Sequence, residues 1–138
     1  MKNSFESDRV WKSHNRGFSM GLIQPEGRVV HFTGQVAWGA DENIIGYGDV
    51  SEQTRQCFLN IEALLGEVGG SLENIISITT YFMNLDDLPK IQRVRNEFLT
   101  GTDLPVSTSI KVAGLGHEAF LVELTPIAVI PNDKIKNR

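Results

Sequence analysis

The sequence predicts an α+β domain in the order ββαβαββ, with one sheet and two helices on one face of it. Two observations support this fold class. Several short runs alternate apolar and polar residues and end at glycine or proline, as half-buried strands do. Two longer stretches repeat apolar residues at helical spacing, and each carries a single apolar stripe. Because such a helix buries only one side, both helices can cover the same face of one sheet.

The composition is that of an ordinary globular domain. The 138 residues suit one domain, 1–138, with an expected ordered core at about 17–131 between an N-terminal arm and a polar tail. No apolar run approaches the roughly 20 residues that span a bilayer. The formal net charge of −4 disfavours nucleic acid as a partner. The single cysteine, Cys57, excludes an internal disulfide and fits a reducing compartment. We therefore expect a soluble cytoplasmic protein that binds no membrane.

The first two strands are predicted to pair as a hairpin within residues 17–36. The first strand alternates Phe18, Met20 and Leu22 with smaller or polar residues. The residues Gln24-Pro25-Glu26-Gly27 have the composition of a turn, and a β-branched strand over 28–36 follows.

The two helices are marked by capping residues and by their stripes. Asp49 and Glu52 form a capping-box pattern at the start of the first helix, and Gly69-Gly70 ends it. The second helix is predicted to be capped by Asp86 or Asp87 and to end before Gly101. Its predicted apolar stripe consists of Leu88, Ile91, Val94 and Phe98. The strand between the helices, 75–82, is expected to place Ile76, Ile78, Thr80 and Phe82 on one side.

The last two strands, about 105–112 and 121–130, are expected to form the floor of any chemical site. One carries Ser107, Thr108 and Ser109, and the other carries a lone carboxylate, Glu123. Strands 28–36 and 121–130 are apolar on both alternations, although helices on one side need only one apolar face. We therefore expect the second face to be buried against other copies of the chain in a cyclic homo-oligomer.

These residues also carry a pattern that resembles the YjgF/RidA family of reactive-intermediate deaminases, some relatives of which are named L-PSP endoribonucleases. The resemblance covers roughly 17–131, in order and at family spacing. Its motifs are Thr33-Gly34-Gln35, the run from Asp49 to Ile61, Gly70 to Phe82, Asp87 to Phe98, Pro105 to Thr108, and Leu121-Val122-Glu123. It implies a chorismate-mutase-like fold and a homotrimer whose sheets form a central barrel, with ligand clefts at the subunit interfaces.

The resemblance implies hydrolysis of 2-imino or enamine acids to a 2-keto acid and ammonia, without cofactor or metal. Such a site needs an arginine fork for the substrate carboxylate and a carboxylate that orients water. In the family pattern the arginine follows the proline by two positions, and here that position is Ser107. A serine provides one neutral hydrogen bond, so we expect carboxylate anchoring to weaken by on the order of 2–4 kcal/mol. Lys111 lies on the same face by alternation and cannot reproduce the fork.

The resemblance assigns the remaining pocket positions residue by residue. The family acid is retained as Glu123, the predicted catalytic residue. The predicted substrate-binding residues are Ser107, Thr33, Phe18, Gln92, Ser109 and Lys111. Phe18 lacks the hydroxyl of the family's tyrosine, Thr33 keeps the hydroxyl of its serine, and Gln92 replaces its asparagine. The hydroxyls of 107–109 are equally compatible with a neutral-ligand pocket and with ordinary strand positions.

Two hypotheses remain open from the sequence. One is an enzyme that hydrolyses a small imine, enamine or related metabolite, with ordinary 2-imino acids disfavoured by Ser107. The other is a non-enzymatic trimer that binds a small ligand as a regulatory or chaperone-like module. An endoribonuclease is disfavoured by the acidic charge balance and by the lack of a basic and aromatic patch. His31 and His117 have no partners at ligand spacing, so no metal site is predicted.

Overall fold

The structure is a computed structural model that describes residues 3–137. Its elements follow the predicted order, with one additional short strand at the N-terminus. The strands are β1 Asn3–Phe5, β2 Gly21–Ile23, β3 Arg28–His31, β4 Ile75–Phe82, β5 Val106–Lys111 and β6 Val122–Ile130. The helices are α1 Val50–Glu67 and α2 Leu88–Phe98, and short 3-10 turns lie at η1 Leu72–Asn74 and η2 Leu85–Asp87. None of the helices in residues 3–137 combines the length and apolar character needed to cross a bilayer.

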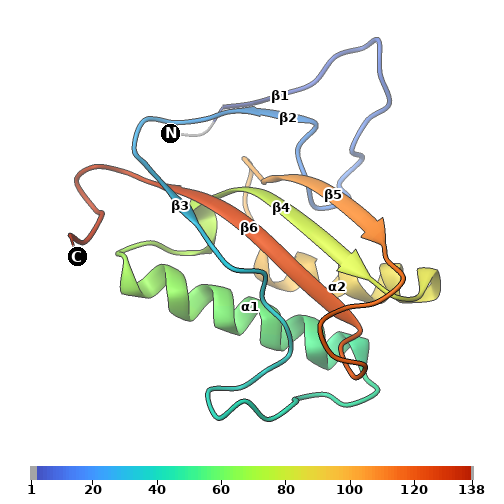
Figure 1. The fold of residues 1–138 in the computed structure, drawn as a ribbon. Helices are drawn as coiled ribbons and strands as arrows, with labels where there is room; N and C mark the ends of the chain where they lie inside the picture. The colour runs from blue at the N-terminus through green and yellow to red at the C-terminus, as the bar shows by residue number, and fades with distance from the viewer. Residues whose placement is uncertain (1–2, 138) are drawn as a thin grey trace.

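The main sheet has four strands in the order β3-β6-β4-β5, and both helices cover one of its faces (Figure 1). Strands β4 and β5 are parallel, and the other neighbours are antiparallel. We call the face away from the helices the open face. The predicted mixed fold with two helices and one sheet is thus confirmed, whereas a barrel of several copies lies beyond a single chain.

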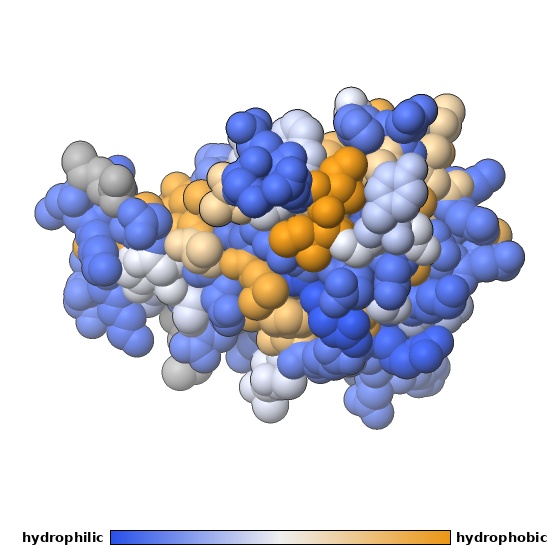
Figure 2. Space-filling view, turned by 90° about the horizontal axis from the view of Figure 1, so that it is seen from below, coloured by the Kyte–Doolittle hydropathy of each residue, from blue (hydrophilic) through white to orange (hydrophobic). Residues whose placement is uncertain are grey.

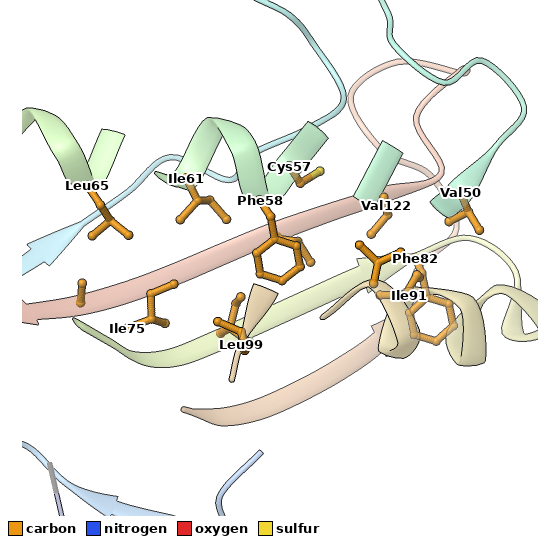
Figure 3. Close-up of a cluster of buried hydrophobic side chains, with 14 residues drawn as sticks. Val50, Cys57, Phe58, Ile61, Leu65, Ile75, Phe82, Ile91, Leu99 and Val122 are labelled. Carbon is orange, nitrogen blue, oxygen red and sulfur yellow. The ribbon is translucent and has the colours of Figure 1, made fainter. Parts of the chain in front are cut away.

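The core fills the space between the helices and the sheet. Cys57, Phe58, Ile61 and Leu65 of α1 point toward the sheet, as Figure 3 shows. Their helical spacing forms an apolar stripe, so this helix buries one side and leaves Leu59 exposed. Leu64, expected on the same stripe, is 41% exposed and lies outside it. The molecule viewed from below, the helix side in Figure 1, is accordingly mostly hydrophilic, with hydrophobic residues gathered near its middle (Figure 2).

Three local predictions need correction. The predicted hairpin over 17–36 is wrong, because β2 pairs with the N-terminal β1 while β3 pairs with β6. Alternating apolar and polar residues indicate that a segment is a strand, but they do not indicate which other strand it pairs with. A register shift between Ile75 and Ser77 places Ile75 in the core instead of Ile76, because an irregularity of this kind changes which face the following residues take. Asp87 is the N-cap residue of α2, as predicted, but its side chain accepts no capping hydrogen bond; Asn84, which caps the preceding turn η2, accepts one from the Asp86 backbone N at 3.0 Å.

The first helix begins as predicted. The carboxylate of Asp49 accepts hydrogen bonds from the backbone N of Ser51 and of Glu52, at 3.1 and 3.2 Å. The tail over 132–137, for which no order was expected, turns back onto the end of α1: the Lys136 backbone N donates to Val68 O at 3.0 Å. Main-chain hydrogen bonds therefore hold a segment whose side chains carry no periodic signal.

Candidate functional site

Glu123 projects from β6 onto the open face of the sheet. Its neighbours Val122 and Leu124 are buried on the helix face, and Glu123 itself is half-buried. Its cross-strand partner is Tyr81, a residue that the sequence reasoning did not single out. Within residues 3–137 the Glu123 carboxylate takes part in none of the hydrogen bonds or ion pairs. A partly shielded carboxylate without a protein partner is free to accept hydrogen bonds from water or from a ligand.

Gly34 explains why Glu123 can occupy this position. A Cβ atom added at Gly34 would overlap Glu123 Oε2 and would lie 3.0 Å from Thr125 Oγ1. The carboxylate therefore lies directly against the main chain of residue 34, where only a glycine leaves room. Thr33 is exposed beside it, and its carbonyl accepts a hydrogen bond from Gln35 Nε2 at 3.0 Å. The structure thus brings together two of the predicted site residues, Thr33 and Glu123.

Pro126 accounts for the early end of β3, which was predicted to run to residue 36. The Leu124 backbone N donates to Gln35 O at 3.0 Å, so the N–H groups of alternate β6 residues point toward β3. Position 126 falls in this series, and proline has no N–H to donate. The ladder stops at His31 and resumes one residue out of step at Gln35. This irregularity leaves the chain around Gly34 outside the regular ladder, close to Glu123.

Cys57 lies on α1 in the core. Burial raises the pKa of its thiol to about 12, and the negative charge of Glu123 adds to the shift. The thiol therefore stays protonated near neutral pH and packs as a small hydrophobic group, as its position in the helical stripe predicts.

The β5 residues lie on the other face of the sheet. Ser107 pairs with Ile78 and Ser109 pairs with Thr80, and both partners are buried beneath the helices. Because paired residues on neighbouring strands share a face, Ser107, Ser109 and Lys111 face the helix side while Glu123 faces the open side. The expectation that Ser107 and Glu123 share one floor is therefore wrong within a single chain. Alternation was applied to each strand separately and could not relate the two.

An arginine that the sequence reasoning missed lies beneath the β5 hydroxyls. Arg95 of α2 is 2% exposed, and its Nη2 donates to Thr80 Oγ1 at 3.2 Å. Burial lowers the pKa of this guanidinium below its ordinary value. A signal was present in the sequence: position 95 is four residues after Ile91 and seven after Leu88, which places it on the apolar stripe of the helix.

The segment around Phe18 closes the same corner of the molecule. The Ser19 backbone N donates to Pro105 O at 3.0 Å, which fixes the segment beside the start of β5. Gly17 has φ of +86°, and a Cβ there would lie 3.8 Å from Arg95 Cδ and would overlap the side chain of Asn96. Phe18 packs edge-on against Trp11, with ring centroids 6.0 Å apart. Gln92, half-buried, lies one helical turn before Arg95. The main chain at Gly17 and the Thr80 hydroxyl thus adjoin Arg95, with Phe18 next to Gly17 in the chain and Gln92 one helical turn away.

Two cavities accompany these groups. One of about 480 Å³ extends from Thr33 to Ala40 and along α1 at Asn60, next to the Glu123 region. Another of about 530 Å³ lies where the 98–105 segment meets η1 and the turn at Pro25, and its lining includes neither Glu123 nor Arg95. Within residues 3–137, no three His, Cys, Asp or Glu side chains gather as metal ligands would. The chain can therefore present two separate polar groups, the Glu123 region and the Arg95 corner.

Comparison with known proteins relates this chain to one family along nearly its whole length. The family model described as Endoribonuclease L-PSP matches residues 14–130. A RutC family protein of Pyrococcus abyssi (strain GE5 / Orsay) is 31% identical over 102 residues, which cover 74% of this chain and 79% of that protein. The mitochondrial protein mmf1 of Schizosaccharomyces pombe is 30% identical over 102 residues, covering 73% of this chain and 62% of that protein.

Solved structures show the same fold. YyfB from Yersinia pestis, described as a protein of unknown function of the conserved Rid protein family, has a TM-score of 0.87 at 27% identity, covering 94% of this chain and 98% of that one. RidA from an Antarctic Psychrobacter has a TM-score of 0.69 at 23% identity, covering 84% and 96%. The resemblance read from the motifs is confirmed, and the chain belongs to the Endoribonuclease L-PSP family, which is the YjgF/RidA family.

Proposed function

We propose that this chain forms a homotrimer with small-molecule clefts between its subunits and hydrolyses an imine or enamine there. The observation that carries the proposal is the Glu123 carboxylate, which is half-buried, lies against Gly34, and has no hydrogen-bond or ion-pair partner in residues 3–137. A carboxylate in such a position can orient a water molecule and accept its proton.

The placement of the two polar groups supports an interfacial site. Glu123 and Ser107 lie on opposite faces of the sheet, so a single cleft that uses both needs two copies of the chain. The open face also carries apolar side chains at both edges of the sheet. Val29 of β3 is 42% exposed and Ile110 of β5 is 40% exposed. Covering these side chains with a second copy removes apolar surface from water, which favours association.

The proposed reaction requires only water and proton transfers. Glu123 accepts a proton from water as the water oxygen bonds to the imine carbon, and the protonated carboxyl returns this proton to the imine nitrogen, which leaves an amine and a hydroxyl group on a tetrahedral carbon. Glu123 then takes the hydroxyl proton and passes it to the amine as the C–N bond breaks, which yields a carbonyl compound and ammonia. Glu123 is the acid–base group in each of these steps. Thr33 is exposed beside Glu123 and would contact the substrate. No metal or cofactor is part of the proposal.

The test is a matched pair of variants. Wild-type protein is expected to accelerate ammonia release from freshly generated imines, and Glu123→Gln to slow it about 10²–10⁴-fold, the range for a general acid–base group. Glu118→Gln, an exposed acid in the loop before β6, should leave the rate unchanged. Light scattering must show the same oligomer for all three proteins. A Glu123→Gln variant that keeps the wild-type rate would remove Glu123 from the chemistry.

A second candidate, a non-enzymatic trimer that binds a small ligand, is favoured by the serine at the family's arginine position, Ser107. It predicts ligand binding without ammonia release from any imine. The endoribonuclease activity in the name of the family model is disfavoured for this chain by its net charge of −4, because RNA carries one negative charge per phosphate. Tight capture of RNA on a filter at low salt would reverse that judgement.

A further inference from the structure

Arg95 is a buried positive charge without a counter-ion in the described chain. Its side chain is 2% exposed, and no Asp or Glu among residues 3–137 forms an ion pair with it. Its Nη2 donates to Thr80 Oγ1 at 3.2 Å, and this hydroxyl is a neutral partner that does not balance the charge. Buried charges in proteins are ordinarily paired with an opposite charge. An unpaired one therefore indicates a partner that comes from outside the chain.

The guanidinium lies beside the position where the family's arginine is missing. Its hydrogen-bond partner Thr80 is the cross-strand neighbour of Ser109 and shares its face. Thr80 and Ser109 lie on neighbouring strands about 4.8 Å apart, and Ser107 is two residues before Ser109 on the same face of β5. The main chain at Gly17 packs against the Arg95 stem, and Gln92 is one helical turn away. The arginine thus enters from α2 into the corner where the resemblance places the substrate.

The charges around this corner also favour an anion. Lys111 lies on the same face of β5 and is exposed, and Arg16 lies over the Trp11 ring, 5.6 Å from its centroid. The nearby acid on α2, Glu97, is paired with Arg55, with Nη2 and Oε1 3.2 Å apart. Glu97, two residues after Arg95 on the same helix, is thus engaged by Arg55 and forms no ion pair with Arg95.

We propose that Arg95 is the anion-binding residue of the interfacial cleft, where it holds the carboxylate of a small organic acid in place of the arginine absent at Ser107. The inference rests on the proposed function only for the cleft itself. A guanidinium offers paired donors that match a carboxylate, and a neutral serine does not. It reassigns the anchoring role to a different element, α2, and makes small carboxylic acids the ligand class of this chain.

The experiment compares one acid with its uncharged analogue. Titration calorimetry with 2-oxobutyrate and with 2-oxobutanamide measures the preference for the carboxylate. Wild-type protein is expected to bind the acid more tightly by about tenfold or more, since charge-assisted hydrogen bonds contribute that much over neutral ones. Arg95→Gln should remove this preference and leave binding of the amide unchanged. Arg95→Lys, which keeps the charge and loses the fork, should retain part of it. Arg93→Gln, an exposed arginine on the same helix, is the matched control and should bind as wild type does.

Three results would overturn the proposal. The first is a wild-type protein that shows no preference for the acid, which needs no variant to observe. The second is an Arg95→Gln variant that keeps the preference. The third is an Arg95→Gln variant that dissociates to monomers while Arg93→Gln does not, because the counter-ion would then be a carboxylate of a second copy. The ammonia-release assay tests the proposed hydrolase independently of the anion site. A protein that releases no ammonia, yet prefers the carboxylate through Arg95, would contradict the proposed hydrolysis and support the anion site.

Discussion

Replacing Arg95 by methionine tests whether this charge is kept for binding at the expense of stability. Methionine has a similar length and no charge, so Arg95→Met removes the guanidinium and retains much of the buried stem. If the charge has no counter-ion in the free protein, its removal should stabilise the fold. If it pairs with a carboxylate of another copy, its removal should destabilise the assembly. The first explanation of Arg95 therefore predicts no loss of stability, and the second predicts a clear loss.

The expected magnitude follows from the burial and the single hydrogen bond. Replacing buried charges with well-packed apolar groups is typically neutral or stabilising by about 1–4 kcal/mol. Arg95 is 2% exposed, which places it in this buried regime. The lost hydrogen bond to Thr80, at 3.2 Å, offsets about 1.5–3 kcal/mol of the gain. The two ranges nearly cancel, so we expect a change between zero and a stabilisation of about 1 kcal/mol, which is at most roughly 3 °C in melting temperature for a domain of this size.

The measurement is urea unfolding of wild type, Arg95→Met and Arg93→Met at one protomer concentration, because the stability of an oligomer depends on concentration. Arg93 is exposed on the same helix, and its variant should stay within about 0.5 kcal/mol of wild type. A loss of about 3–5 kcal/mol in Arg95→Met alone would refute the reasoning, because breaking a buried ion pair has that effect.

Two further predictions concern Glu123 and Cys57. Gly34→Ala should lower the rate of imine hydrolysis about 10²-fold, because the added Cβ displaces the Glu123 carboxylate. Gly114→Ala is the control and should have no effect, because a Cβ there meets no atom within 4 Å. Equal rates for the two variants would show that Gly34 does not position Glu123 for the reaction. Cys57, with its pKa raised to about 12, should resist iodoacetamide at pH 8 in the native protein and react in guanidinium chloride. Rapid alkylation of the native protein would contradict the burial of Cys57. The raised pKa also makes the free energy of unfolding fall as pH rises above the ordinary thiol pKa of 9.0, because only the unfolded chain then releases the proton.

Much of the fold could be predicted because the decisive signals are local. The stripe of α1 and the Asp49 cap are short-range patterns, and the structure places α1 at Val50–Glu67 accordingly. The strand β4 was predicted at its observed bounds, since β-branched and aromatic residues fill it. Pairing was less predictable: the partner of β2 depends on which edge is nearby in space, and the end of β3 depends on Pro126, almost a hundred residues further along the chain.

The candidate site shows the same division. The sequence by itself determined the family and the identities at the expected pocket positions, including Glu123 and the serine at 107, because these depend on residue types at fixed spacing. Only the tertiary structure decided that Glu123 and Ser107 face opposite sides of the sheet, since strand register relates residues that alternation treats one strand at a time. It also decided that Arg95 lies buried beneath the β5 hydroxyls. The sequence shows that Arg95 falls on the apolar stripe of α2. Only the structure shows that it is buried and that residues 3–137 supply no counter-ion for it.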